Sequence, residues 1–76
     1  MPSLDQLTVG QRAVVTDVQG DDALGQRLME MGLLVGTTVE VVRFAPLGDP
    51  VELKVRGYNL TLRKHEAEQI LVRPDA

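Results

Sequence analysis

Apolar and polar residues alternate from Val51 to Val55 and again from Tyr58 to Leu62, with only Arg56-Gly57 between the two runs. Period-two alternation on both sides of a two-residue connection predicts a β-hairpin. The connection sets the register, so Val55 pairs with Tyr58, and the apolar side chains of both runs share one face that we expect to be buried. The turn type stays open, because arginine disfavours the positive φ angles of two-residue hairpin turns.

Three more segments have the composition of strands. Residues 12–18 are rich in β-branched side chains and lie between two glycines, as is typical of a strand bounded by turns. Residues 38–45 form a second such segment, and their alternation slips after Val41, as a β-bulge would produce. Residues 70–73 form the last expected strand, which we expect to end at Pro74 because proline cannot donate a ladder hydrogen bond.

A change of period after residue 20 predicts one helix. Leu24, Leu28 and Met31 follow one another at intervals of four and three residues, which is the spacing of one face of an amphipathic helix. We expect this helix to run from about Asp22 to Met31. It should end at Gly32, since glycine readily adopts the left-handed conformation that stops a helix.

Together these elements predict a mainly β fold class. Five short strands, one α-helix between the first and second strands, and a helical turn at residues 64–68 fit a small, strongly bent barrel. We expect the barrel to close, because closure removes the sheet edges that a short open sheet would expose. With 76 residues the chain can bury one core, so residues 1–76 should form a single domain.

Composition narrows the classes of function. The chain has 8 Lys and Arg against 11 Asp and Glu, a formal net charge of -3, which is the wrong sign for general attraction to nucleic acid or anionic lipid. One Phe, one Tyr and no Trp leave no stacking platform for single-stranded nucleic acid. We therefore expect no nucleic acid partner and no direct membrane insertion. The lack of cysteine and of an export signal favours a cytoplasmic location.

The sequence offers no catalytic constellation. Its single histidine, His65, lies in a charged run beside the expected helical turn, where a solvated side chain is the simpler interpretation. The glycines at positions 20 and 25 have the spacing of a phosphate-binding loop, but Gln26-Arg27 stands where lysine and serine or threonine are required. We predict that the chain is not an enzyme and holds no cofactor.

A metal site has only three candidate ligands close together in the sequence: His65, Glu66 and Glu68. Imidazole with carboxylate suits borderline first-row ions. Their spacing does not force the three side chains onto one face, so we expect a charged surface turn here and no specific metal site.

Two features indicate a protein partner. Lys54 and Arg56 make the expected hairpin basic on an otherwise acidic chain, which favours docking onto an acidic surface. The predicted core accounts least for three apolar residues, Met29, Leu33 and Leu47. We predict that these five residues contact a partner. The alternative is that the barrel and helix cover the apolar side chains and that water solvates the charged ones.

A series of short motifs runs along the chain from about Leu4 to Val72. They are Arg27-Leu28-Met29-Glu30-Met31-Gly32-Leu33, Gly36-Thr37, Ala45-Pro46-Leu47-Gly48-Asp49-Pro50, Gly57-Tyr58-Asn59-Leu60-Thr61-Leu62-Arg63 and Glu66-Ala67. Each motif alone is common. Because the motifs occur in this order and at this spacing, the chain resembles the ferrous iron transport protein A (FeoA) family. Val35 departs from the pattern, because proline is expected before the Gly36 turn, and this affects only the rigidity of that turn.

The resemblance implies an SH3-like barrel with a helix inserted between its first and second strands, which agrees with the elements predicted above. It also implies a small cytosolic accessory protein of bacterial ferrous iron uptake. Such proteins are thought to act on the membrane permease FeoB, whose cytosolic part carries a GTP-binding domain. The family has no agreed functional residues, so none is transferred to this chain.

Alternatives remain open. The same SH3-like domain resembles the C-terminal part of iron-dependent repressors, which makes a regulatory interaction domain the second hypothesis. A free-standing metal chaperone and a binder of proline-rich peptides rank after it, because the chain has few metal ligands and only Phe44 and Tyr58 for an aromatic groove. Association into a homo-oligomer is also left open.

Overall fold

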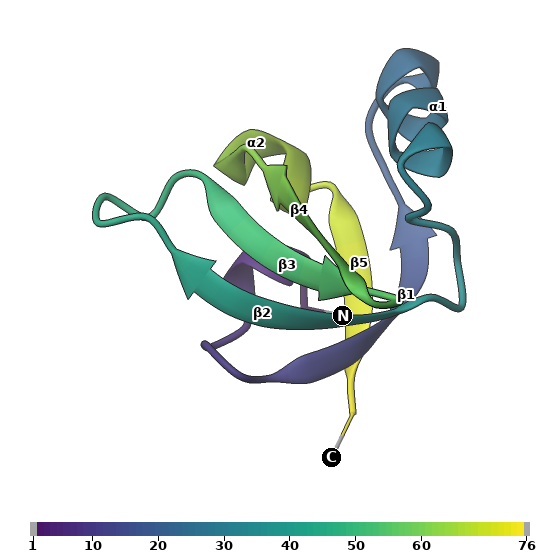
Figure 1. Cartoon of the computed structure of the whole chain (residues 1–76). Coiled ribbons are helices and arrows are strands. Elements are labelled where there is room, and N and C mark those ends of the chain that lie inside the picture. Colours follow the sequence, from purple (N-terminus) through teal and green to yellow (C-terminus); the bar gives the residue numbers. More distant parts are fainter. Residues whose placement is uncertain (1, 76) are drawn as a thin grey trace.

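The computed structural model describes residues 2–75 and contains five strands and three short helices (Figure 1). In chain order the elements are η1 (Leu4–Gln6), β1 (Arg12–Val18), α1 (Asp22–Glu30), β2 (Thr38–Phe44), β3 (Val51–Val55), β4 (Tyr58–Leu62), α2 (Lys64–Ala67) and β5 (Ile70–Pro74). The mainly β fold with one helix between the first two strands is confirmed. Four predicted bounds shift by one residue: α1 ends at Glu30, β2 at Phe44 and α2 at Ala67, while β5 extends to Pro74, which pairs with Ala13.

The five strands form one antiparallel sheet with the order β4-β3-β2-β1-β5. The predicted closure by hydrogen bonds is wrong: β4 and β5 are the two ends of the sheet, and α2 connects them. The sheet still curves strongly (Figure 1). Register shifts between Val15 and Asp17 in β1 and between Val41 and Arg43 in β2 mark bulges, which bend and twist a strand. The slip expected after Val41 is thus confirmed.

The β3–β4 hairpin has the predicted register, with Val55 opposite Tyr58. Arg56 has a φ of 48° and Gly57 a φ of 89°, so both central residues adopt the positive φ angles of a type I′ turn. The apolar face of the hairpin is buried except at Leu60, which is half-buried, and at Tyr58, which is 44% exposed. The exposure of Tyr58 has a physical reason, since Tyr58 is the first residue of an end strand and carries a hydroxyl group that needs a polar partner.

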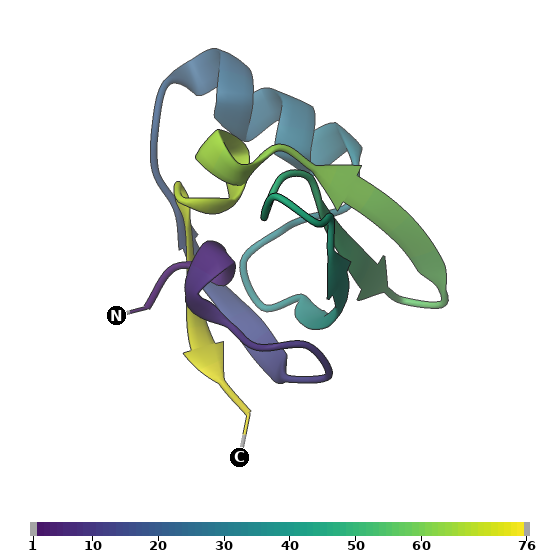
Figure 2. The same cartoon turned by 90° about the vertical axis from the view of Figure 1, so that its left-hand side faces the viewer.

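The core lies inside the curve of the sheet, and α1 crosses one end of the molecule with α2 next to it (Figure 2). Buried apolar residues come from all five strands, and α1 contributes Leu28. The side chain of Asp21 accepts a hydrogen bond from the Leu24 amide (2.8 Å) and caps the start of α1. Gly32 follows the last turn of α1, as predicted, and has a φ of 90°.

Candidate functional site

A basic, open hollow of about 530 Å³ lies beside the β3–β4 turn. Arg12, Lys54 and Arg56 line it, together with Glu40. Glu40 lies directly opposite both Lys54 and Arg12 in the sheet, so one carboxylate stands in a row with cations on either side. Three cations against one carboxylate leave an excess of two positive charges. The basic hairpin predicted from the sequence therefore gains Arg12, which comes from a strand 40 residues earlier in the chain and could not be assigned to it by spacing.

These three cations are available to an external partner. The ion pairs that the structure contains within residues 2–75 join Arg27 to Glu66 and Arg43 to Glu52. No carboxylate of the described residues thus lies within ion-pair distance of Arg12, Lys54 or Arg56, and all three residues are exposed. Desolvating such groups is favourable only when a partner supplies the opposite charge.

Exposed apolar side chains lie at the end of α1 and on the segment that leads from it to the basic hollow. Met29 at the end of α1 is 60% exposed, and Leu34 and Val35 in the following segment are 44% and 65% exposed. Gly36, the next residue, lines the hollow itself. Figure 1 shows this connecting segment between α1 and β2 on the same side of the molecule as the β3–β4 turn. We call this set of six residues the hairpin-end surface: Arg12, Met29, Leu34, Val35, Lys54 and Arg56.

Leu33, which was predicted to contact a partner, is buried, whereas its neighbour Leu34 is exposed. Leu33 is only 1% exposed and belongs to the hydrophobic core, so its side chain cannot contact a partner. Its amide donates to the carbonyl oxygen of Leu28 (2.9 Å), which turns Leu33 inward while Leu34 and Val35 stay outside. The segment has neither helical nor strand periodicity, so no pattern in the sequence could separate these neighbours.

Leu47 is almost fully exposed, at 95%, but it lies apart from the other candidates. It belongs to the β2–β3 loop, at the opposite end of β3 from Arg56 (Figure 1). The five residues of β3 separate the two ends by roughly 17 Å at about 3.4 Å per residue. Among the predicted contacts, the structure therefore brings Met29, Lys54 and Arg56 to one side and leaves Leu47 on another.

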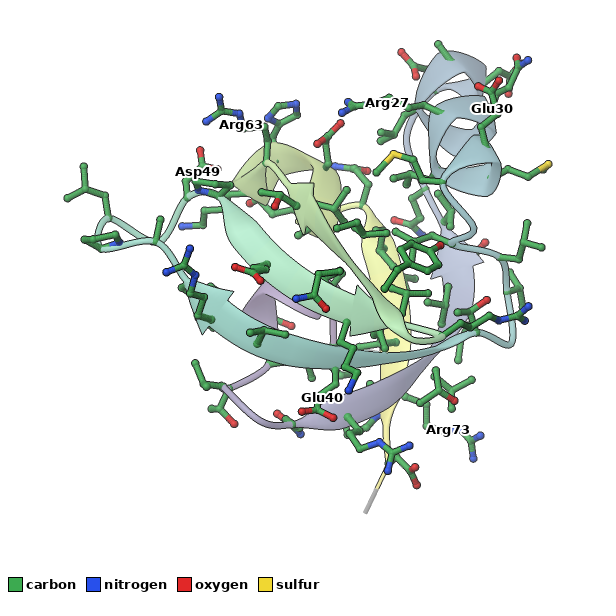
Figure 3. The ribbon with its side chains drawn as sticks, in the orientation of Figure 1. Arg27, Glu30, Glu40, Asp49, Arg63 and Arg73 are labelled. Carbon is green, nitrogen blue, oxygen red and sulfur yellow. The ribbon has the colours of Figure 1, made fainter. Side chains whose placement is uncertain are left out.

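Two contacts fix α1 relative to the sheet and so hold the apolar half of the hairpin-end surface. The Tyr58 hydroxyl of β4 donates a hydrogen bond to the Met31 carbonyl at the end of α1. Nearer its middle, Arg27 points toward α2, whereas Glu30 lies on the other side of the helix (Figure 3). The Arg27 guanidinium pairs with the buried carboxylate of Glu66.

The three residues considered as metal ligands, His65, Glu66 and Glu68, differ in their environment: Glu66 is buried, whereas His65 and Glu68 are exposed. Glu66 is buried, and besides its ion pair with Arg27 it accepts a hydrogen bond from the Arg63 amide (2.9 Å). His65 lines an open hollow of about 480 Å³ between α1 and α2, and Glu68 is exposed outside its lining. Within the described part of the chain, no three His, Cys, Asp or Glu side chains gather in a way that could hold a metal ion.

No helix among residues 2–75 has the length and apolar character needed to cross a bilayer.

The FeoA domain model matches residues 3–74. An "Fe(2+) transport protein A/Fe(2+) transporter FeoB fusion protein" of Porphyromonas gingivalis (strain ATCC BAA-308 / W83) is 41% identical over 69 residues. These residues are 91% of this chain but only 8% of the fusion protein.

Solved structures agree in fold. The FeoA protein of Chlorobium tepidum has a TM-score of 0.92 at 47% identity, covering 99% of this chain and 71% of that one. FeoA of Stenotrophomonas maltophilia in complex with zinc, described as a procaryotic SH3 domain protein, has a TM-score of 0.83 at 32% identity, covering 96% and 91%. A manganese-dependent transcriptional repressor shares the fold at 14% identity, with a TM-score of 0.91, over 36% of its length. The SH3-like fold is thereby confirmed, and the chain belongs to the FeoA domain family.

Proposed function

We propose that the chain is a non-enzymatic, cytoplasmic accessory protein of bacterial ferrous iron uptake, and that it binds the cytosolic part of a FeoB-type permease through the hairpin-end surface. The observation that carries the proposal is the meeting of exposed apolar side chains with unpaired cations at one end of the domain. Such a combination is typical of a surface whose partner is acidic at the rim and apolar at the contact.

The fusion relative supports the choice of partner. In that protein a region similar to this chain is joined to an Fe(2+) transporter. Covalent linkage raises the effective concentration of one module at the other, which is useful when the two must bind each other. Wherever the domain is not linked to the transporter, it needs enough affinity of its own to bind, and the hairpin-end surface supplies candidate contacts.

A binding module of this kind acts through differential affinity. It shifts a partner toward whichever state it binds more tightly, by no more than the difference in binding free energy between the two states. The GTP-binding part of the permease offers two such states, with GDP and with GTP. Regulation then requires only that the hairpin-end surface fits one of them better.

Binding of the purified chain to full-length permease in lipid nanodiscs tests the proposal. The titration is done with GDP and with a nonhydrolysable GTP analogue at physiological salt, and the isolated GTP-binding domain is measured in parallel. Micromolar or tighter binding in at least one nucleotide state supports the proposal, and the ratio of the two affinities gives the coupling free energy. Absence of binding up to high micromolar concentrations in every state would refute it.

The likeness to the manganese-dependent repressor favours one second candidate, a regulatory interaction domain that acts on a separate DNA-binding protein. At this identity the likeness extends to the fold alone. Affinity capture with the purified chain distinguishes the two candidates: retention of a metal-dependent repressor, with no retention of the permease, would favour the second.

A further inference from the structure

The outer edge of β4 is a second surface with a defined chemistry. In a two-residue hairpin the residues that flank the turn exchange both backbone hydrogen bonds, and bonded and non-bonded pairs then alternate. Val55 and Tyr58 flank the turn, so the amide and carbonyl groups of Asn59 and Thr61 point away from β3. Both residues are exposed, and no other strand within residues 2–75 pairs with this edge.

The other end of the sheet differs. The N-terminal segment covers β5, since Ser3 forms a bridge with Leu71 and the Val72 amide donates to the Pro2 carbonyl (2.9 Å). The β5 edge therefore has a cover from its own chain along part of its length. No strand among the described residues pairs with the outer edge of β4, and the end of α1 contacts β4 at the Tyr58 side chain. The backbone of this edge beyond Tyr58 is therefore the place where an additional strand can join the sheet.

Cationic residues at both ends of β4 indicate which kind of segment can bind its outer edge. Arg56 lies at one end of the strand, and Arg63 and Lys64 lie at the other (Figure 3 labels Arg63). All three are exposed, and within residues 2–75 none forms an ion pair. The Asp49 carboxylate accepts a hydrogen bond from the Lys64 amide (3.0 Å), so two cations face one carboxylate at that end. An extended segment with acidic residues at both ends would still meet an excess of positive charge at each end.

A second copy of this chain fits less well. Antiparallel pairing that joins Asn59 of one copy to Thr61 of the other places Arg56 opposite Lys64 and Gly57 opposite Arg63. Each end of the paired strands would then hold three cations, which is unfavourable because like charges directly opposite one another destabilise a sheet. The cations that disfavour this pairing of two copies are the same ones that favour an acidic segment.

The inner side of β4 defines the middle of that segment. Tyr58 is 44% exposed and Leu60 is half-buried, and their side chains alternate with those of Asn59 and Thr61. A strand beside β4 therefore needs an apolar residue at every second position, on the side of Tyr58 and Leu60.

We propose that the outer edge of β4 binds an extended segment of five or six residues, acidic at its ends and apolar at alternate positions, as an added strand. This inference rests on the proposed function and deepens it, because the segment belongs to the cytosolic part of the permease. The backbone groups of Asn59 and Thr61 form the hydrogen bonds to the added strand. Arg56, Arg63 and Lys64 favour a segment whose ends are acidic.

A synthetic peptide tests the pairing directly. The probe has glutamate at both ends and alternating valine and threonine between them, and the control has lysine at both ends. NMR of the full chain should show slower amide hydrogen exchange at Asn59 and Thr61, by about tenfold at saturation, because pairing protects these amides. The lysine peptide should bind about tenfold more weakly or not at all.

Thr61→Pro removes one outward amide and no bond to β3, since proline is tolerated at the free edge of a sheet. It should weaken binding of the glutamate peptide about tenfold, whereas the matched variant Thr61→Ala should stay within about threefold. A heteronuclear spectrum with unchanged core resonances shows that Thr61→Pro has folded. If it has not, Thr61 N-methylation by peptide ligation removes the same donor.

Three results would overturn the proposal: unchanged exchange at Asn59 and Thr61 with saturating peptide, equal binding of the lysine peptide, or protection that depends on protein concentration without peptide, which would identify a second copy as the occupant. The permease distinguishes this proposal from the proposed function. If the chain binds the permease while the exchange of these two amides is unchanged, the edge proposal fails and the proposed function stands. If the glutamate peptide binds but the permease does not, the β4 edge still accepts an acidic strand, whereas the proposed function fails and the permease is not the source of that strand.

Discussion

The hydroxyl group of Tyr58 occupies the space into which a side chain on Gly32 would extend, and it donates a hydrogen bond to the adjacent carbonyl of Met31. The β3–β4 hairpin thereby holds the end of α1. Gly32 meets two requirements at once, a φ of 90° and the close approach of Tyr58. The position of Met29, Leu34 and Val35 relative to the basic hollow depends on this contact.

Gly32→Ala should therefore destabilise the protein by about 2 to 3 kcal/mol, since left-handed φ costs a residue with a side chain about 1 to 2 kcal/mol and the Tyr58 hydrogen bond is lost as well. Gly25→Ala is the matched control. A side chain there meets nothing within 4 Å, and alanine in a helix interior should stabilise by about 0.5 to 1 kcal/mol. Urea unfolding measures both. Equal stability of the two variants would contradict the role of Gly32.

Arg27→Gln should destabilise the protein by about 1 to 3 kcal/mol. The Glu66 side chain is 2% exposed, and it would lose its cation while keeping only the Arg63 amide as a partner. This loss of stability is smaller than that expected on breaking a fully buried ion pair, because the Arg27 side chain is 57% exposed.

Arg43→Gln is the control for Arg27→Gln. The Arg43 side chain is 75% exposed beside Glu52, whose side chain is 25% exposed, so its loss should cost less than about 1 kcal/mol. Thermal unfolding of the two variants under the same conditions measures the difference. A larger loss for Arg43→Gln would show that burial of Glu66 does not determine the strength of its ion pair.

Leu33→Ala should cost about 2 to 4 kcal/mol, because it removes a fully buried side chain and leaves a cavity. Leu34→Ala, one residue later, should change stability by less than about 0.5 kcal/mol, because Leu34 is exposed. Chemical denaturation of this neighbouring pair checks the orientation of the whole segment. Should Leu34→Ala prove the more damaging of the two, the inward and outward assignments would have to be exchanged.

Lys54→Gln together with Arg56→Gln should slow association with the permease about tenfold at low salt and leave dissociation nearly unchanged, since exposed charges mainly steer encounter. The difference should shrink as the salt concentration rises. Stopped-flow association over a series of salt concentrations measures this effect. Arg43→Gln, which removes a cation near the other end of β2, should have a much smaller effect, and equal slowing would indicate only a response to net charge.

Local patterns in the sequence were enough to predict most of the fold. The alternation in residues 51–62 predicted the register of the hairpin, and the slip after Val41 predicted the bulge in β2, because both signals come from neighbouring residues. Closure could not be predicted in the same way. Whether β4 meets β5 depends on how far the bulged strands bend and on the path of α2, which are properties of the whole sheet.

The candidate site was harder to predict, because it joins residues from distant segments. Arg12 belongs to the basic hollow only through the pairing of β1 with β2, and sequence spacing carries no such information. Leu47 is exposed in the β2–β3 loop, and its separation from Arg56 follows from the direction of β3. Leu33 and Leu34 differ only in orientation within an irregular segment.

The affinity of two paired variants for full-length permease in nanodiscs tests the central claim most directly. The account predicts that Leu34→Ser combined with Val35→Ser weakens binding about tenfold or more, because both side chains lose apolar burial at the interface. Leu47→Ser, on the other side of the molecule, should change the affinity by less than about twofold. Loss of binding with Leu47→Ser, and wild-type affinity with the Leu34 and Val35 substitutions, would place the partner on the β2–β3 loop and contradict the account.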